Sequence, residues 1–249
     1  MIAACLETLN RGGAHLASAP TGIGKTAAAL AAAFEHVHTS DSPKTVVFLT
    51  PKQSQHEIVV ETVRMINGKL RQGSKQIKLV DLIGRESMCE TVNPLTGKCE
   101  CEQNSGEASL QSRKEDIRRY ILEEPRHVGE TIDISKIWGV CAWSACRSAV
   151  RDCDVLVCDY NHIFIDDIRE SSLGSMRLEI ENIVLIVDEA HNLPSRVRMG
   201  MRRRKKQCEA NGKTKWMPQE SLQLLPWLLG ASCGFLWPPR IFCGVSCGF

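Results

Sequence analysis

A glycine-rich turn at residues 19–26 limits the folds open to this chain more than any other segment. It reads Ala-Pro-Thr-Gly-Ile-Gly-Lys-Thr, and it lies between an apolar run at 14–19 and an alanine-rich run at 25–38. Glycines let the backbone turn back and point its amide N–H groups at one anion. The N-terminus of a following helix adds the positive end of its dipole. The pattern predicts a strand, a phosphate-binding loop and a helix, in that order.

The residue types of this loop suit a nucleoside triphosphate. Lys25 is expected to contact the β- and γ-phosphates, and the Thr26 hydroxyl is expected to bind magnesium. Ala19 stands where the usual pattern has glycine, and a small side chain is tolerated there. We therefore expect the nucleotide to contact the whole loop, which comprises Ala19, Pro20, Thr21, Gly22, Ile23, Gly24, Lys25 and Thr26.

An acidic motif follows a second apolar run. The run at 183–187 reads Ile-Val-Leu-Ile-Val, and Asp-Glu-Ala-His comes directly after it. Ligands of open α/β sheets bind at the carboxyl ends of strands, so Asp188 is expected to hold magnesium. Glu189 is the candidate general base that orients or deprotonates the attacking water. His191 lies too far along to contact the γ-phosphate, and we expect it to couple the nucleotide to the rest of the protein. The predicted catalytic residues are Lys25, Asp188 and Glu189.

Short apolar runs alternate with segments whose apolar residues recur three and four positions apart. The runs predict strands and the spaced segments predict helices. Such alternation indicates an α/β fold with a parallel sheet that carries helices on both faces. The expected strands are 14–19, 45–50, 78–83, 154–159 and 183–187, and the expected helices are 25–38, 55–67 and 110–124.

Composition limits the class of protein and its partners. The chain has 249 residues, 43% of them hydrophobic, and a formal net charge of +2, so any nucleic-acid surface must be local. No run of 18 apolar residues occurs, and the N-terminus lacks the pattern of a secretory signal. We expect no membrane contact. The expected location is the cytoplasm of a prokaryote or the nucleus of a eukaryote.

Five of the twelve cysteines lie in a polar segment, residues 84–152, that interrupts the strand–helix alternation. Disulfide scaffolds are usually shorter chains, so a metal centre is the favoured explanation. Four thiolates suit an iron–sulfur cluster or structural zinc, and the sequence does not separate the two. Cys99 and Cys101 are separated by one residue, which is a tight spacing for either group, and Cys146 is a possible substitute for one of them. The expected ligands are Cys89, Cys99, Cys101 and Cys141, and the expected buried apolar fillers are Cys5, Cys153 and Cys158.

The two nucleotide motifs together resemble those of superfamily 2 helicases. Residues 50–55, Thr-Pro-Lys-Gln-Ser-Gln, resemble the segment of that superfamily that contacts the single-strand backbone. Thr50 and Gln53 are therefore candidate DNA contacts through their hydroxyl and amide groups. A polar turn between a strand and a helix, with Ser54 as its N-cap, explains the same residues without DNA.

The cysteine arrangement resembles that of the iron–sulfur helicases of the XPD and DinG group. This resemblance covers residues 1 to about 200 and implies a RecA-like P-loop lobe at 1–83 and 153–200. It also implies a [4Fe–4S] insertion at 84–152, with Arg85, four residues before Cys89, as a further DNA contact. ATP, Mg²⁺ and single-stranded DNA would be the ligands, with 5′-to-3′ unwinding as the activity. DNA repair is the expected process, with proteins of repair complexes as possible partners.

Two clusters of basic residues are candidates for phosphate contacts. Arg113, Lys114, Arg118, Arg119, Arg126 and His127 form the first cluster, whose acidic neighbours equally favour an ordinary solvated surface. The second cluster is denser and has no acidic neighbours. It consists of Arg196, Arg198, Arg202, Arg203, Arg204, Lys205 and Lys206.

Composition changes near the end of the chain. Residues 207–249 hold three of the five tryptophans and few charges after Glu220. We therefore expect residues 201–249 to form an atypical tail outside the fold. No motif of a second motor lobe follows residue 192, so the chain is expected to be incomplete and weakly active or inactive alone. The alternatives are a non-motor nucleotide- and DNA-binding module with a structural metal, and a redox protein.

Overall fold

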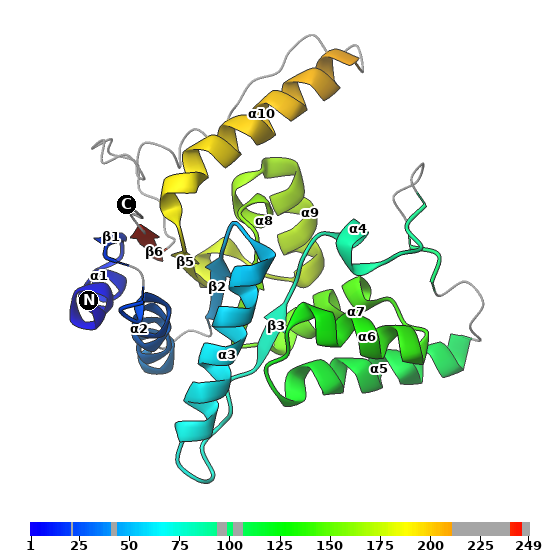
Figure 1. The fold of residues 1–249 in the computed structure, drawn as a ribbon, viewed down its shortest axis with the longest axis horizontal. Helices are drawn as coiled ribbons and strands as arrows, with labels where there is room; N and C mark the ends of the chain where they lie inside the picture. Colours follow the sequence, from blue (N-terminus) through cyan, green and yellow to red (C-terminus); the bar gives the residue numbers. More distant parts are fainter. Residues whose placement is uncertain (21, 41–43, 94–98, 102–106, 211–239, 246–249) are drawn as a thin grey trace. The chain divides into compact units, whose positions relative to one another are not determined.

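The computed structural model (Figure 1) confirms the predicted α/β fold and its parallel strands. Contacts divide the chain into two units, Met1–Pro51 with Asp159–Phe249, and Lys52–Cys158. The structure describes the chain except residues 21, 41–43, 94–98, 102–106, 211–239 and 246–249, and only the backbone of 107–108, 203–210 and 240–245.

The first unit contains four parallel strands in the order β1-β6-β5-β2. They are β1 (Ala14–Ser18), β2 (Thr45–Leu49), β5 (Ile183–Val187) and β6 (Arg240–Val245). Helix α1 packs against α2, and α8 packs against α9, so both pairs belong to this unit. The helices are α1 (Ile2–Arg11), α2 (Lys25–Thr39), α8 (Asn161–Phe164), α9 (Asp166–Met176) and α10 (Leu193–Ala210), with 3-10 turns η2 (Ile180–Asn182) and η3 (Ala190–Asn192).

Strand β5 is the best-buried strand of this unit. All five of its residues are buried, and its partner β2 is buried from the second residue on. A strand covered on both faces takes a continuous β-branched run, which is what β5 has. Val187 pairs with Leu49, and the Asp188 N–H donates to the Leu49 carbonyl at 2.8 Å. The register therefore fixes where the acidic motif begins.

Strand β1 differs from the buried strand that its apolar run predicts. Its residues are exposed or half-buried, and Leu16 is 61% exposed. β1 stands at the end of the strand order within this unit and pairs only with β6 among the described strands. Position in the sheet, which the apolar run does not encode, accounts for the difference.

The segment predicted to be a tail outside the fold contributes to two elements. Helix α10 continues to Ala210, and Arg240–Val245 forms β6, parallel to both β1 and β5. The β6 sequence Arg-Ile-Phe-Cys-Gly-Val carries three residue types that favour strands. The cysteine, glycine and proline residues in and around this short run obscure the strand pattern, so the strand was not predicted.

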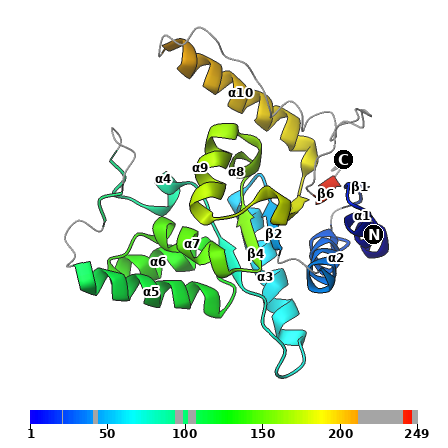
Figure 2. The ribbon, with the colours of Figure 1, turned by 180° about the vertical axis from the view of Figure 1, so that it is seen from behind.

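The second unit contains one parallel pair of strands, β3 (Leu79–Asp81) and β4 (Val155–Cys158). Helix α3 contacts both strands, and α5 contacts α6 and α7. The predicted insertion at 84–152 thus shares one unit with the chain segments on either side of it. The helices of the second unit are α3 (Gln53–Lys69), α4 (Arg85–Met88), α5 (Glu107–Glu123), α6 (Val128–Trp138) and α7 (Ala142–Ala149), followed by the 3-10 turn η1 (Val150–Asp152). The same elements are seen from behind in Figure 2.

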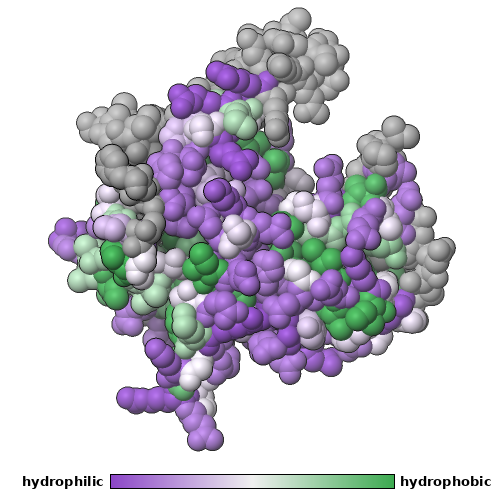
Figure 3. All heavy atoms as spheres, in the orientation of Figure 1, coloured by the Kyte–Doolittle hydropathy of each residue, from purple (hydrophilic) through white to green (hydrophobic). Residues whose placement is uncertain are grey.

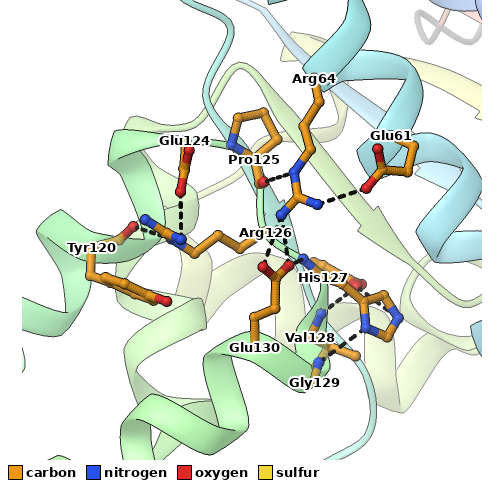
Figure 4. Close-up of polar contacts among 11 residues, drawn as sticks. Glu61, Arg64, Tyr120, Glu124, Pro125, Arg126, His127, Val128, Gly129 and Glu130 are labelled. Carbon is orange, nitrogen blue, oxygen red and sulfur yellow. Dashed lines mark hydrogen bonds and ion pairs between the residues drawn. The ribbon is translucent and has the colours of Figure 1, made fainter.

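Arg64 joins α3 to the start of α6 (Figure 4). Its Nε donates to the Pro125 carbonyl at 2.8 Å, and its guanidinium pairs with Glu61 at 2.6 Å and with Glu130 at 2.7 Å. Glu130 also accepts from the His127 N–H, while the His127 ring accepts from the Gly129 N–H, which together form a capping box on α6. One side chain therefore holds a helix start against a neighbouring helix.

We expect Arg64→Ala to destabilise this unit by about 1–3 kcal/mol, because three contacts are lost and one is to a backbone carbonyl. Urea unfolding followed by circular dichroism measures the change. Arg119→Ala is the matched control, since Arg119 is 72% exposed and has a single 3.5 Å ion pair with Asp116. Equal midpoints for the two variants would show that the Arg64 contacts add nothing.

None of the helices in the described part of the chain is long and apolar enough to cross a membrane.

Candidate nucleotide site and metal centre

The phosphate loop connects β1 to α2. Gly22 and Gly24 have φ values of 81° and 82°, a left-handed conformation that side chains rarely adopt, and Gly24 is the N-cap of α2. The Lys25 ammonium donates to the carbonyl oxygens of Ala19 at 3.0 Å and Pro20 at 2.8 Å. These contacts fold the lysine back over the loop. The predicted strand, turn and helix are therefore present in the predicted order.

The other loop residues divide by exposure. Pro20 and Ile23 are exposed, and Thr26 is half-buried in the first turn of α2, where its hydroxyl lies next to the loop. Thr21 lies outside the described residues. The loop thus presents backbone and small side chains, which suits an anion bound through amide N–H groups.

Asp188 and Lys25 belong to the same unit although they are far apart in the sequence. Burial raises the pKa of Asp188, and the charge of Glu189 raises it further, whereas the charges of Lys25 and His191 lower it. Both residues follow parallel strands, Lys25 after the loop that ends β1 and Asp188 directly after β5. A lysine in a phosphate loop and a carboxylate at the end of a parallel strand can together hold phosphate and its magnesium.

The backbone of the acidic motif is strained at one position. Glu189 has a φ of 50°, which is uncommon for a residue with a side chain and recurs at functional sites. Its carboxylate lies 3.2 Å from Nδ1 of His191, which is exposed. The two side chains interact directly, so a change at one of them is transmitted to the other.

Tyr160 also lies at this site, although no role was predicted for it from the sequence. Its hydroxyl donates to the carbonyl oxygens of Asp188 and Glu189, the latter at 3.0 Å. The Tyr160 side chain is buried and follows the end of β4 by two residues. The contact holds the turn in which Glu189 has its unusual conformation. The only signal in the sequence was that Tyr160 lies within the segment, residues 1 to about 200, that resembles the iron–sulfur helicases.

The three predicted DNA-contacting residues lie in different surroundings. Thr50 is fully buried, so its hydroxyl is not presented to a phosphate, whereas Gln53 at the start of α3 is exposed. Arg85 lies over the ring of Trp143 with its guanidinium carbon 3.9 Å from the ring centre. Arg147 lies 4.1 Å from the same ring, and burial together with the charge of Arg85 lowers the pKa of Arg147. Two guanidinium groups on one tryptophan link the segments on either side of the cysteines.

Four cysteines meet in the second unit. The Sγ atoms of Cys89, Cys99, Cys101 and Cys141 all lie within 4.8 Å of one another. Cys89 ends α4, Cys141 is the N-cap of α7, and Cys99 forms an isolated antiparallel bridge with Val92. The thiols of three chain segments therefore lie close together.

The four clustered thiols differ in their pKa values. Burial is the main cause that raises the pKa of Cys99 to about 11, and it likewise raises those of Cys101 and Cys141 to about 12. Burial also opposes ionisation of Cys89, but hydrogen bonds from Thr91, Cys101 and Cys99 outweigh it and lower the pKa of Cys89. The Cys89 and Cys101 sulfurs are 3.6 Å apart. A bound cation would have to displace the thiol protons, because metals bind thiolates.

The donor set fits both groups that the sequence left open. Four sulfur ligands serve iron–sulfur clusters and structural zinc alike. A zinc ion with four sulfurs at about 2.3 Å requires sulfurs about 3.8 Å apart, close to the 3.6 Å between Cys89 and Cys101. A cluster has four irons between the sulfurs and requires them to spread farther.

Cys146 is outside this group of four in the described part of the chain. Its side chain is completely buried in α7, and burial raises the pKa of its thiol. Cys5, Cys153 and Cys158 are buried too, in the core positions that suit small apolar side chains. All eight described cysteines are free of disulfides.

Comparison with known protein families gives a match that spans residues 50–202. The matching family is DEAD_2, and the matched segment is more than half of the chain. The chain belongs to the DEAD_2 family. The DEAD_2 segment includes all four clustered cysteines, Tyr160 and the acidic motif, whereas the phosphate loop precedes it.

Curated relatives of this DEAD_2 protein include two named helicases. The regulator of telomere elongation helicase 1 homolog of Arabidopsis thaliana is 29% identical over 164 residues, which are 61% of this chain and 15% of that protein. The ATP-dependent DNA helicase CHL1 of Saccharomyces cerevisiae is 30% identical over 77 residues, 31% of this chain and 8% of that protein. The DEAD_2 chain therefore corresponds to a small part of each relative.

Two solved structures share its fold. An XPD helicase has a TM-score of 0.53 at 20% identity, over 77% of this chain and 32% of that one. A truncated XPD has a TM-score of 0.51 at 20% identity, over 78% and 52% of the two chains. At this identity the likeness supports the fold, which is the RecA-like fold that the resemblance implied.

Proposed function

We propose that this chain is the first motor lobe of an ATP-dependent DNA helicase with a four-cysteine metal centre. The observation that carries the proposal is that the glycine-rich loop after β1 and the acidic motif after β5 follow parallel strands of one unit. The relative named ATP-dependent DNA helicase CHL1 supports the choice of DNA as the polymer.

Each nucleotide-binding residue then has one task. Lys25 binds the β- and γ-phosphates, Thr26 and Asp188 hold magnesium, and Glu189 orients the attacking water. His191 contacts Glu189 at 3.2 Å and is placed to transmit its state to the rest of the protein. Transfer of the phosphoryl group also needs positive charge from a second lobe, so hydrolysis by this chain alone should be weak or absent.

The four thiols would hold a [4Fe–4S] cluster, and its bound form would cross-link three chain segments. Gln53 and Arg85 are the proposed DNA contacts, on single-stranded DNA translocated 5′ to 3′. DNA repair is the proposed process, with proteins of repair complexes as partners, in the nucleus or the cytoplasm.

A second candidate is a non-motor nucleotide- and DNA-binding module with structural zinc. The 3.6 Å separation of the Cys89 and Cys101 sulfurs favours it, because that spacing suits one tetrahedral ion. Iron and zinc analysis of protein purified without oxygen separates the two. About four irons per chain with brown colour support the cluster, and one zinc without colour supports the module.

Lys25→Ala is expected to weaken binding of a fluorescent ATP analogue by about 10- to 100-fold, because charge-assisted contacts to phosphate are lost. Fluorescence titration in the presence of magnesium measures it. The control is Lys75→Ala, which removes a 74% exposed lysine paired with Asp154 in the other unit. Unchanged affinity of the Lys25 variant would contradict the nucleotide site, whatever the outcome for the metal.

A further inference from the structure

Helix α10 follows the acidic motif directly and carries a dense run of positive charge. It spans Leu193–Ala210, beginning two residues after His191. Seven arginines and lysines lie between positions 196 and 206, and no aspartate or glutamate occurs from 190 to 208. The formal charge of this segment is therefore +7 on a chain whose total is +2. So uneven a distribution is an electrostatic signal for a polyanion.

One face of α10 anchors it to the unit. Leu193 and Val197 are 0% and 1% exposed, and α10 contacts α8 and η3. A Cβ added at Gly200 would lie 2.1 Å from Cδ1 of Ile165, so the Ile165 side chain packs directly against the α10 backbone there. Figures 1 and 2 both show α10 beside α8 and α9. A helix held in this way can present its other face without rearranging.

That other face is cationic. Arg196, Arg198 and Arg202 are exposed, and Figure 3 shows mainly hydrophilic residues over the described part of α10. Arg196 donates to the Pro51 carbonyl at 3.2 Å, and Arg198 donates to the Pro194 carbonyl at 3.2 Å. Within the part of the chain that the structure describes, no carboxylate forms an ion pair with these three arginines. Among the described residues, the charge of these three arginines is therefore not neutralised.

The first basic cluster differs from the second in its ion pairs. Three of its arginines are paired with carboxylates, so little of their net charge is offered to a ligand. The ion pairs are Arg118 with Glu115 and Asp152, Arg119 with Asp116, and Arg126 with Glu124. In the part of the chain that the structure describes, the second cluster thus keeps three arginines without an ion pair, namely Arg196, Arg198 and Arg202.

We propose that the exposed face of α10 binds the phosphate backbone of single-stranded DNA. This inference rests on the proposed helicase function and adds a contact surface to it. Arginines suit phosphate because the guanidinium offers several donors in one plane. Binding through phosphates should be insensitive to base sequence and should weaken as salt displaces the strand.

The experiment uses the full 249-residue chain and a fluorescein-labelled oligonucleotide of twenty thymidines, with affinity measured by anisotropy at several salt concentrations. Arg198→Glu with Arg202→Glu should weaken binding by at least about tenfold near 0.1 M salt and lower the salt slope by about 1.4. The control is Arg11→Glu with Arg119→Glu, which makes the same change in net charge at exposed arginines paired with Glu7 and Asp116. It should bind like the parent chain.

Folding is checked by retained binding of the ATP analogue, and Arg198→Gln with Arg202→Gln should give an intermediate loss. Equal affinities for the α10 and control variants would overturn the inference while the helicase proposal stands. Absence of DNA binding by the parent chain would overturn the DNA part of the proposed function. Displacement of the oligonucleotide by poly-L-glutamate at equal charge concentration would indicate an acidic protein as the partner and would also overturn the inference.

Discussion

Cys101→Ala is expected to release the metal and to lower the thermal unfolding midpoint of the metal-loaded chain by roughly 10 °C. Its sulfur lies in the group of four within 4.8 Å and only 3.6 Å from that of Cys89. Structural zinc contributes about 10–16 kcal/mol to the folding of small domains. Loss of even part of this free energy destabilises a protein more than most point mutations do. Metal analysis and calorimetry, both under nitrogen, measure the two effects.

Cys146→Ala is the matched control for this variant. Cys146 lies in the same unit and is completely buried, but it is outside the four-sulfur group. It should retain the full metal content and lose only the packing of one sulfur atom. If Cys146→Ala lost the metal and Cys101→Ala kept it, the proposed ligand set would be contradicted. Cys146 would then be the ligand in place of Cys101.

Asp81→Ala is expected to destabilise the second unit by about 3–5 kcal/mol. The Asp81 side chain is 1% exposed, and its two oxygens accept from Nδ1 of His56 at 2.5 Å and from the Val128 N–H at 2.8 Å. Nε2 of His127 is 3.8 Å away. Removal of the carboxylate leaves buried donors without an acceptor, which costs more than the net gain of an ordinary hydrogen bond.

Urea unfolding of the metal-free chain checks this second prediction. Asp81→Asn should lose less, because its amide oxygen still accepts one of the two bonds. Asp152→Ala removes a carboxylate that is 46% exposed and pairs with Arg118, so it should cost less than about 1 kcal/mol. Similar midpoints for Asp81→Ala and Asp152→Ala would show that the buried network does not stabilise this unit.

The nucleotide motifs were predictable because each is local. Gly22 and Gly24 sit in one turn, and Asp188 follows a strand whose burial is encoded in five consecutive apolar residues. Chain order alone therefore gave the strand, turn and helix. It did not give the contact of Tyr160 with the carbonyl oxygens of Asp188 and Glu189, since a tyrosine after a strand has no characteristic spacing.

The cysteines show a limit of the same kind. Spacing left Cys99, Cys101 and Cys146 as competitors, and only the folded chain groups the sulfurs of Cys99 and Cys101 with those of Cys89 and Cys141. The identity of the metal stays a proposal, because four sulfurs suit both candidates. The short strand Arg240–Val245 was not predicted, since its six residues carry too little pattern to stand out.

The sequence by itself determined the α/β class, the phosphate loop, the acidic motif and the two basic clusters, because these depend on residues close together in the chain. Tertiary structure decided which thiols meet and, among the described residues, which arginines of the basic clusters have ion pairs. It also decided that Asp81 holds His56 and the start of α6 in the core. These outcomes depend on distances between residues far apart in the chain, and such distances are set by packing.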